Sequence, residues 1–147
     1  SLWLWGGGLL PEIAAPDFTA IWSDNPLAVG LASAAGIEAP PCPAGLNGLL
    51  ADADLNSHQL VVLDSLLPPV LYEDGPGWRE AWAALDRDWF VPLRGELGRR
   101  IDTLNIVAPT IYGQLTWTLN GKDRWKFWRK SRPLQAIAQE LAEGSAP

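Results

Sequence analysis

The sequence has little of the chemistry that sulfur and imidazole provide. It contains no methionine, one cysteine and one histidine among 147 residues. The single cysteine, Cys42, excludes an internal disulfide and a cysteine-based zinc cage. The single histidine, His58, argues against a histidine-rich metal site. Because the sequence places no catalytic partner for His58, we expect this side chain in a surface loop.

Long hydrophobic runs are also absent. No apolar run reaches the roughly 18 residues that a membrane-spanning helix requires. The chain does not begin with a charged segment followed by an apolar one, so a signal peptide is not indicated. Since cysteine pairs that suit an oxidising compartment are missing, a cytoplasmic protein without a membrane partner is the default expectation.

What the chain has is material for a core. Hydrophobic residues make up 48% of it, and nine residues are Trp, each able to bury of order 150–250 Å². The length fits one domain, so we predict a single domain over residues 1–147. The net charge of −6 is unevenly distributed, because residues 122–132 hold six of the eleven Lys and Arg side chains.

The first eight residues are the most distinctive stretch. The run Leu2–Trp5 is continuously apolar, which is typical of a strand covered on both faces, as in a parallel sheet between helices. The residues Gly6, Gly7 and Gly8 follow, and they predict either a tight turn at the strand end or a turn that contacts a ligand. Because a chain rarely begins inside a buried strand, we expect this one to be a piece of a longer protein.

Strand and helix patterns alternate along the rest of the chain, as in α/β domains. A helix is expected to begin at Pro26, with Asp24 or Asn25 as its cap, and to end at Gly36. The expected strands cover residues 18–22, 59–64, 101–107 and 114–119, and the expected helices cover 27–35, 46–53, 78–100 and 134–142.

The helix expected over 78–100 carries a stripe of Trp and Leu side chains at helical spacing. The stripe predicts core packing, with an aromatic ligand platform as the alternative. Pro92 lies inside the pattern and is expected to kink or divide the helix. Further on, Asn120-Gly121 is a turn dipeptide of the type that closes a hairpin.

Two acidic residues, Asp24 and Asp64, follow expected strands directly. In open α/β sheets ligands bind beyond the carboxyl ends of the strands, and two carboxylates there would be able to hold Mg²⁺ or Mn²⁺. The alternative is structural, with Asp24 as a helix cap and Asp64 as a hydrogen-bond acceptor in a loop.

The segment Lys122–Arg132 interleaves its six bases with three aromatic residues. Its aromatic rings are expected to cover a groove while the Lys and Arg stems extend to solvent. Two further alternatives are contact with an anionic ligand or acidic protein surface and, least expected, binding of single-stranded nucleic acid. Candidate contacts for an anionic partner are Arg124, Lys126, Trp128 and Arg129.

Several strings taken together resemble one proteobacterial family, whose members are labelled cofactor-independent phosphoglycerate mutase-like or RpfE-type regulatory proteins. The strings are Ser1–Gly8 followed by Leu-Leu-Pro, Ile21–Ala28, Leu60–Asp64 and Arg124–Trp128. The resemblance implies that the chain is the C-terminal half of such a protein. It also implies an alkaline-phosphatase-like α/β fold, with a mostly parallel sheet and helices on both faces in a three-layer α/β/α arrangement.

Cofactor-independent mutases use a Ser nucleophile and two Mn²⁺ ions held by Asp and His clusters, and this chain has no matching cluster. We therefore expect a non-catalytic regulatory domain without a metal site of its own. Its partners would be the N-terminal half of the same protein and a small anionic ligand or another protein. The alternative is a phosphoryl-transfer enzyme that uses Mn²⁺ or Mg²⁺. Its nucleophile and metal ligands would lie in the N-terminal half, and Gly6–Gly8, Asp24 and Asp64 would line the shared cleft.

Overall fold

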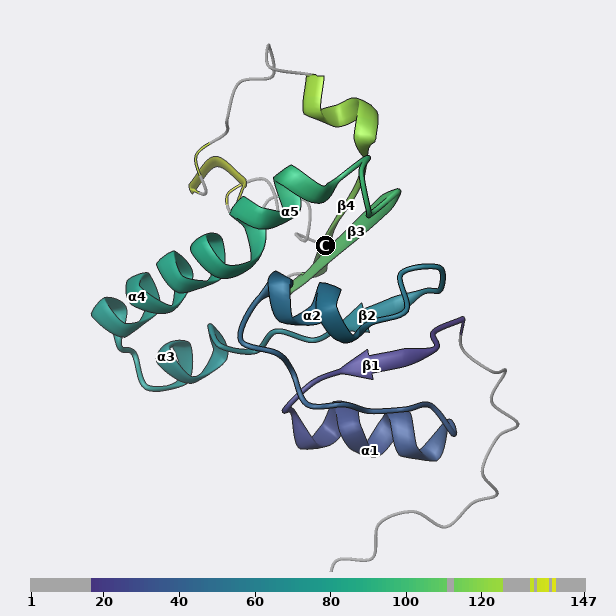
Figure 1. Ribbon diagram of the computed structural model, residues 1–147. Coiled ribbons are helices and arrows are strands. Elements are labelled where there is room, and N and C mark those ends of the chain that lie inside the picture. Colours follow the sequence, from purple (N-terminus) through teal and green to yellow (C-terminus); the bar gives the residue numbers. More distant parts are fainter. Residues whose placement is uncertain (1–16, 111–112, 126–132, 134, 138, 140–147) are drawn as a thin grey trace, which may run out of the picture.

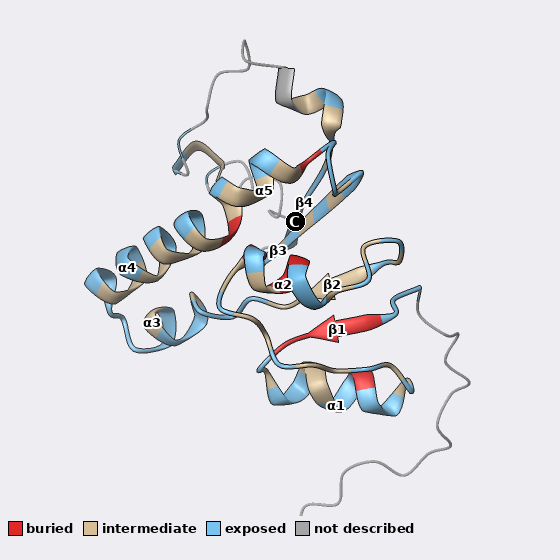
Figure 2. Ribbon diagram, in the orientation of Figure 1, coloured by how far each residue is buried: buried red, intermediate tan, exposed pale blue. Residues whose placement is uncertain are grey.

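A short parallel sheet centred on strand β1 (Ala20–Trp22) organises the first half of the protein. The computed structural model describes residues 17–110, 113–125, 133, 135–137 and 139 (Figure 1). β1 pairs in parallel with β2 (Gln59–Val61), in a register that joins Ile21 to Leu60. On its other side the Ile21 amide donates to the Glu38 carbonyl at 2.9 Å. β1 thus lies between two neighbours, and it is buried along its length (Figure 2).

Helix α1 (Pro26–Ala34) begins and ends where the sequence predicts. The Asn25 side chain accepts hydrogen bonds from the amides of Leu27 and Ala28, so Asn25 is the N-cap. Pro26 occupies the first turn, where a missing N–H costs nothing. After the helix, Gly36 has a φ of +69°, the conformation that glycine adopts most readily at a helix end.

The long helix expected over 78–100 is divided into three parts: α4 (Gly75–Leu85), the π-helical turn η1 (Asp86–Phe90) and α5 (Val91–Glu96). Pro92 explains the division, because it has no N–H to donate to the carbonyl four residues back, that of Asp88. The prediction that Pro92 divides the helix is confirmed, but the predicted end at Arg100 is wrong. The helix stops at Glu96, two residues before Gly98 with its φ of +76°.

Another segment of backbone packs directly against the π-helical turn. Gly45 precedes helix α2 (Leu46–Asp52), and a Cβ at Gly45 would lie only 2.8 Å from the Asp88 carbonyl oxygen. Glycine therefore allows α2 to start directly against η1. Helix α3 (Leu67–Leu71) contains Pro68-Pro69, and both prolines lie in its first turn, where they are tolerated.

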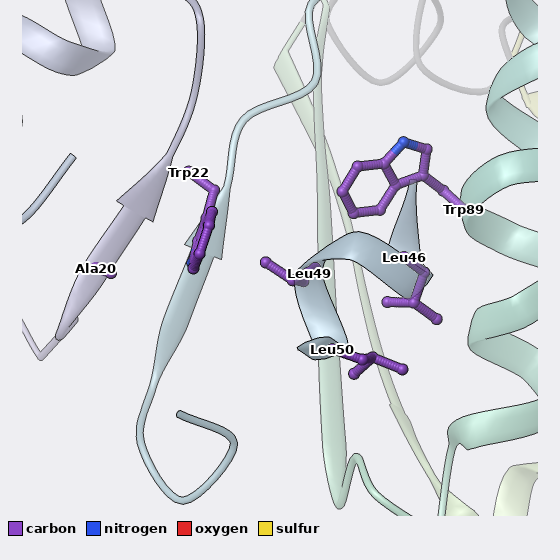
Figure 3. Packing of buried hydrophobic residues seen from close by; sticks show 6 residues of the cluster. All are labelled: Ala20, Trp22, Leu46, Leu49, Leu50 and Trp89. Carbon is purple, nitrogen blue, oxygen red and sulfur yellow. The ribbon is translucent and has the colours of Figure 1, made fainter. Parts of the chain in front are cut away.

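The core lies around α2. Figure 3 shows the α2 leucines between Trp22 of β1 and Trp89 of η1. Of the Trp and Leu stripe on the long helix, Trp89 and Leu97 are buried, as predicted. Trp82 is instead 38% exposed and stacks on Trp78, with ring centroids 5.5 Å apart. The cluster consists of Ala20, Trp22, Leu46, Leu49, Leu50 and Trp89.

A separate antiparallel hairpin follows, formed by β3 (Thr103–Thr110) and β4 (Gly113–Asn120). The prediction that Asn120-Gly121 closes a hairpin is wrong. The register pairs Thr103 with Asn120, so the chain reverses at the other end of the ribbon. Asn120 instead leads into the 3-10 turn η2 (Gly121–Trp125), and its side chain accepts a hydrogen bond from the Lys122 amide.

The predicted fold class, a mostly parallel sheet with helices on both faces in three α/β/α layers, is wrong for the described residues. They form two sheets of two strands each, one parallel and one antiparallel. The physical reason is chain connectivity: β3 and β4 are consecutive, and adjacent strands pair with each other at lower entropic cost than with a distant sheet. The expected strand Leu2–Trp5 and most of the expected helix over 134–142 lie outside the described residues.

Candidate functional site

A cavity of about 280 Å³ opens beyond the carboxyl ends of β1 and β2. Three parts of the chain line it: the residues that follow the two strands, the loop that precedes α2, and one face of α4 and η1. The lining residues are Asp24, Cys42, Pro43, Ala44, Val62, Leu63, Asp64, Ser65, Ala81, Ala84, Leu85, Asp88 and Trp89. Both strand-end carboxylates that the sequence singled out, Asp24 and Asp64, therefore border one cavity.

The Asn25 side chain ties the two strand ends together. Its Oδ1 atom accepts from the Leu27 amide at 2.9 Å, while its Nδ2 atom donates to Asp64 Oδ2 at 3.0 Å. The neighbouring Ser23 is buried, and its Oγ atom accepts from the Asn25 amide at 3.0 Å. One amide side chain thus caps α1 and orients the Asp64 carboxylate at the cavity.

Asp24 is oriented by the loop that precedes α2. Its Oδ1 atom accepts a hydrogen bond from the Cys42 amide at 3.2 Å. Since Asn25 caps α1, Asp24 does not serve as the helix cap that the sequence allowed. Its carboxylate instead joins the end of β1 to the Pro-rich loop that precedes α2, and it borders the cavity.

Two further cavity residues, Cys42 and Asp88, were not identified as site residues from the sequence. The Arg87 guanidinium donates two hydrogen bonds to Asp88, at 2.8 and 2.7 Å, and these lower the pKa of the Asp88 carboxyl. The adjacent opposite charges of Arg87 and Asp88 were the only sequence signal for this pair. For Cys42 there was none, because only the folded loop brings the thiol between the two strand ends.

The Cys42 thiol is half-buried, and its pKa is raised, first by burial and then by the negative charges of Asp24 and Asp64. All three effects disfavour a thiolate. The cavity therefore holds a neutral thiol beside its carboxylates at physiological pH, which argues against a cysteine nucleophile.

The raised pKa of Cys42 predicts slow alkylation. We expect the pH at which iodoacetamide reacts at half its maximal rate to be higher for the folded protein than for the urea-unfolded chain. Because the folded state holds the thiol proton more tightly, this group's contribution to stability is present below the unfolded pKa and is lost as the pH rises through the folded pKa. Replacing Asp24 with Asn should lower the folded midpoint only in part, since burial is the larger cause. A folded midpoint at or below the unfolded one would contradict this.

Within the described residues, no group of three or more His, Cys, Asp and Glu side chains is placed to hold a metal ion. Two carboxylates on one cavity are compatible with Mg²⁺ where water or a ligand supplies the remaining oxygens.

Most of the other candidate residues lie outside the described part of the chain: Gly6, Gly7 and Gly8, and Lys126, Trp128 and Arg129. The backbone of Arg124 lies in η2. The predicted contact of the glycine turn with a ligand therefore stays a prediction.

His58 lies at the other end of the strands. It is exposed, as expected for a loop histidine, and its Nδ1 atom is 2.7 Å from Asp17 Oδ2. A second cavity, of about 240 Å³, lies near Thr19, Ser57 and Gln59. The Gln59 amide donates to both hydroxyls at 2.8 Å and accepts from the Trp22 indole. These hydrogen bonds join β1 to β2.

Comparison with known proteins adds no assignment. No protein-family model matches the sequence, and comparisons with curated proteins and with solved structures give no match. Among the helices of the described residues, none is both long and apolar enough to cross a membrane.

Proposed function

We propose that this chain is a non-catalytic, ligand-binding regulatory domain, and that its ligand enters the cavity at the carboxyl ends of β1 and β2. The observation that carries the proposal is the convergence of Asp24 and Asp64 on that cavity. Their carboxylates are held by hydrogen bonds from Cys42 and Asn25, so the site is organised before a ligand arrives.

The charge of the site selects the ligand. Asp24, Asp64 and Asp88 all border the cavity, and among the described residues that line it there is no Lys or Arg. An anion alone would be repelled, so the small anionic ligand expected from the sequence would enter only with a divalent cation. A ligand that presents an amino group fits the same carboxylates directly.

The wider assignment rests on the sequence. We propose a cytoplasmic protein of the phosphoglycerate mutase-like or RpfE-type group, with this chain as its C-terminal part and the N-terminal half of the same protein as its partner. The resemblance of the strings around Ser1–Gly8 and Ile21–Ala28 supports this. A phosphoryl-transfer enzyme remains the competing function, because two carboxylates and a bridging Mg²⁺ or Mn²⁺ would also hold a phosphate ester.

Thermal unfolding of the protein tests the site. The panel contains small amines, and phosphorylated metabolites with and without Mg²⁺ or Mn²⁺. A ligand at 100 times its Kd should add about 2.7 kcal/mol of stability, roughly 5–10 °C in Tm for a domain of this size. We expect a shift with an amine that is lost in Asp24→Asn and Asp64→Asn.

The matched control is Asp102→Asn, which removes an exposed carboxylate that does not line the cavity. Asparagine keeps a side-chain oxygen that can accept the hydrogen bond from the Cys42 amide, so the Asp24→Asn variant should fold. A shift that requires both a metal and a phosphate would favour the enzyme instead. Shifts that survive in both site variants would refute the cavity as the binding site.

A further inference from the structure

Helix α3 and the residue that follows it expose large apolar side chains that a folded domain normally buries. The exposed fraction rises from 50% at Leu67 through Val70 and Leu71 to 83% at Tyr72. We call these four residues the α3 surface. Single exposed apolar residues are common, but four within six consecutive positions form a patch of the kind that marks interaction sites.

Local hydrogen bonds order the backbone on both sides of the α3 surface. The Leu67 amide donates to the Asp64 carbonyl at 2.9 Å, and the Asp74 amide donates to the Pro69 carbonyl at 2.8 Å. Beyond it, the Asp74 side chain caps α4, which lies beside α3 (Figure 1). Because these turns already order the backbone locally, a partner would lose little backbone entropy in binding this surface.

Acidic residues border the α3 surface. Asp64 precedes it, and Glu73 and Asp74 follow it directly. From residue 17 to residue 78 the chain holds six aspartates and two glutamates but no Lys or Arg. The α3 surface is therefore apolar and is flanked along the chain by three carboxylates, and the first basic residue after it is Arg79 on α4.

We propose that the α3 surface docks a basic amphipathic segment of a partner protein. Apolar side chains of such a segment would pack on Leu67, Val70 and Leu71, and its Lys and Arg side chains would face the flanking carboxylates. The same charges disfavour nucleic acid and anionic membrane surfaces, both of which attract basic proteins. None of the four apolar residues lines the strand-end cavity, so the docking surface is separate from the proposed ligand site except at Asp64, which borders both.

The test measures the fluorescence anisotropy of a labelled helical peptide made of Leu on one face and Lys on the other. A peptide with Glu in place of Lys is the charge control. We expect binding of the Lys peptide only, weakened by added salt. Leu71→Asp should weaken binding of the Lys peptide about ten-fold or more, because burial of one Leu is worth about 1.5–3 kcal/mol. This loss is expected even though the new Asp adds a negative charge. Glu73→Lys should also weaken binding.

The matched control is Val91→Asp on α5, which changes a side chain of similar exposure, 54%. Equal weakening by Val91→Asp and Leu71→Asp would overturn the proposal, as would equal binding of the Glu peptide or no binding at all. Sedimentation of the unlabelled protein completes the test. A dimer that disappears in Leu71→Asp would show that a second copy of the chain occupies this surface. That result would overturn the proposal of a different partner protein.

Discussion

Replacement of Trp89 with alanine should lower the free energy of unfolding by about 3–5 kcal/mol, the usual cost of removing a large aromatic side chain from a core. Trp89 is 6% exposed and belongs to the buried cluster with the α2 leucines (Figure 3). It also lines the strand-end cavity, so its loss would enlarge that cavity as well as remove packing. Urea unfolding followed by circular dichroism measures the change.

The control for this substitution is Trp82→Ala, the same chemical change at a side chain that is 38% exposed and stacks on Trp78. Its cost should be clearly smaller, because less apolar area leaves water there on folding. If the two alanine variants lost equal stability, the core would not be centred on η1 and α2 as described.

The second large effect is expected at Gly98. A Cβ there would lie 2.5 Å from the Gly121 Cα atom, and the φ of +76° disfavours any L side chain. Gly98→Ala should therefore cost about 1–3 kcal/mol for the strained backbone, and a similar amount for overpacking against Gly121. Because this contact joins the end of α5 to the end of β4, amide hydrogen exchange should accelerate in the β3–β4 hairpin first.

Two other glycines separate these contributions. Gly36 has a φ of +69° with no atom near its missing Cβ, so Gly36→Ala carries the backbone strain alone. Gly30 lies inside α1 with neither constraint, and Gly30→Ala should stabilise the protein by roughly 0.5–1 kcal/mol. A Gly98 variant no less stable than the Gly36 variant would show that the contact between Gly98 and Gly121 is not tight.

Local chemistry made part of this protein predictable from its sequence. Asn25 and Pro26 begin α1 and Gly36 follows its end, because capping and positive φ are properties of a few adjacent residues. Pro92 divides the long helix for an equally local reason, the missing N–H. The convergence of Asp24 and Asp64 followed from a simple rule, since residues after parallel neighbouring strands lie at the same edge of the sheet.

Tertiary structure decided the rest, because it depends on which distant segments meet. Both segments were expected as strands, yet β1 pairs in parallel with a strand 39 positions later, while β3 pairs with the strand that follows it. Cys42 and Asp88 reach the cavity only through the packing of a Pro-rich loop and a π-helical turn against the strand ends. A sequence shows which side chains are apolar and which need a hydrogen-bond partner. The geometry of packing determines which partner each one meets, since many pairings satisfy the same local preferences.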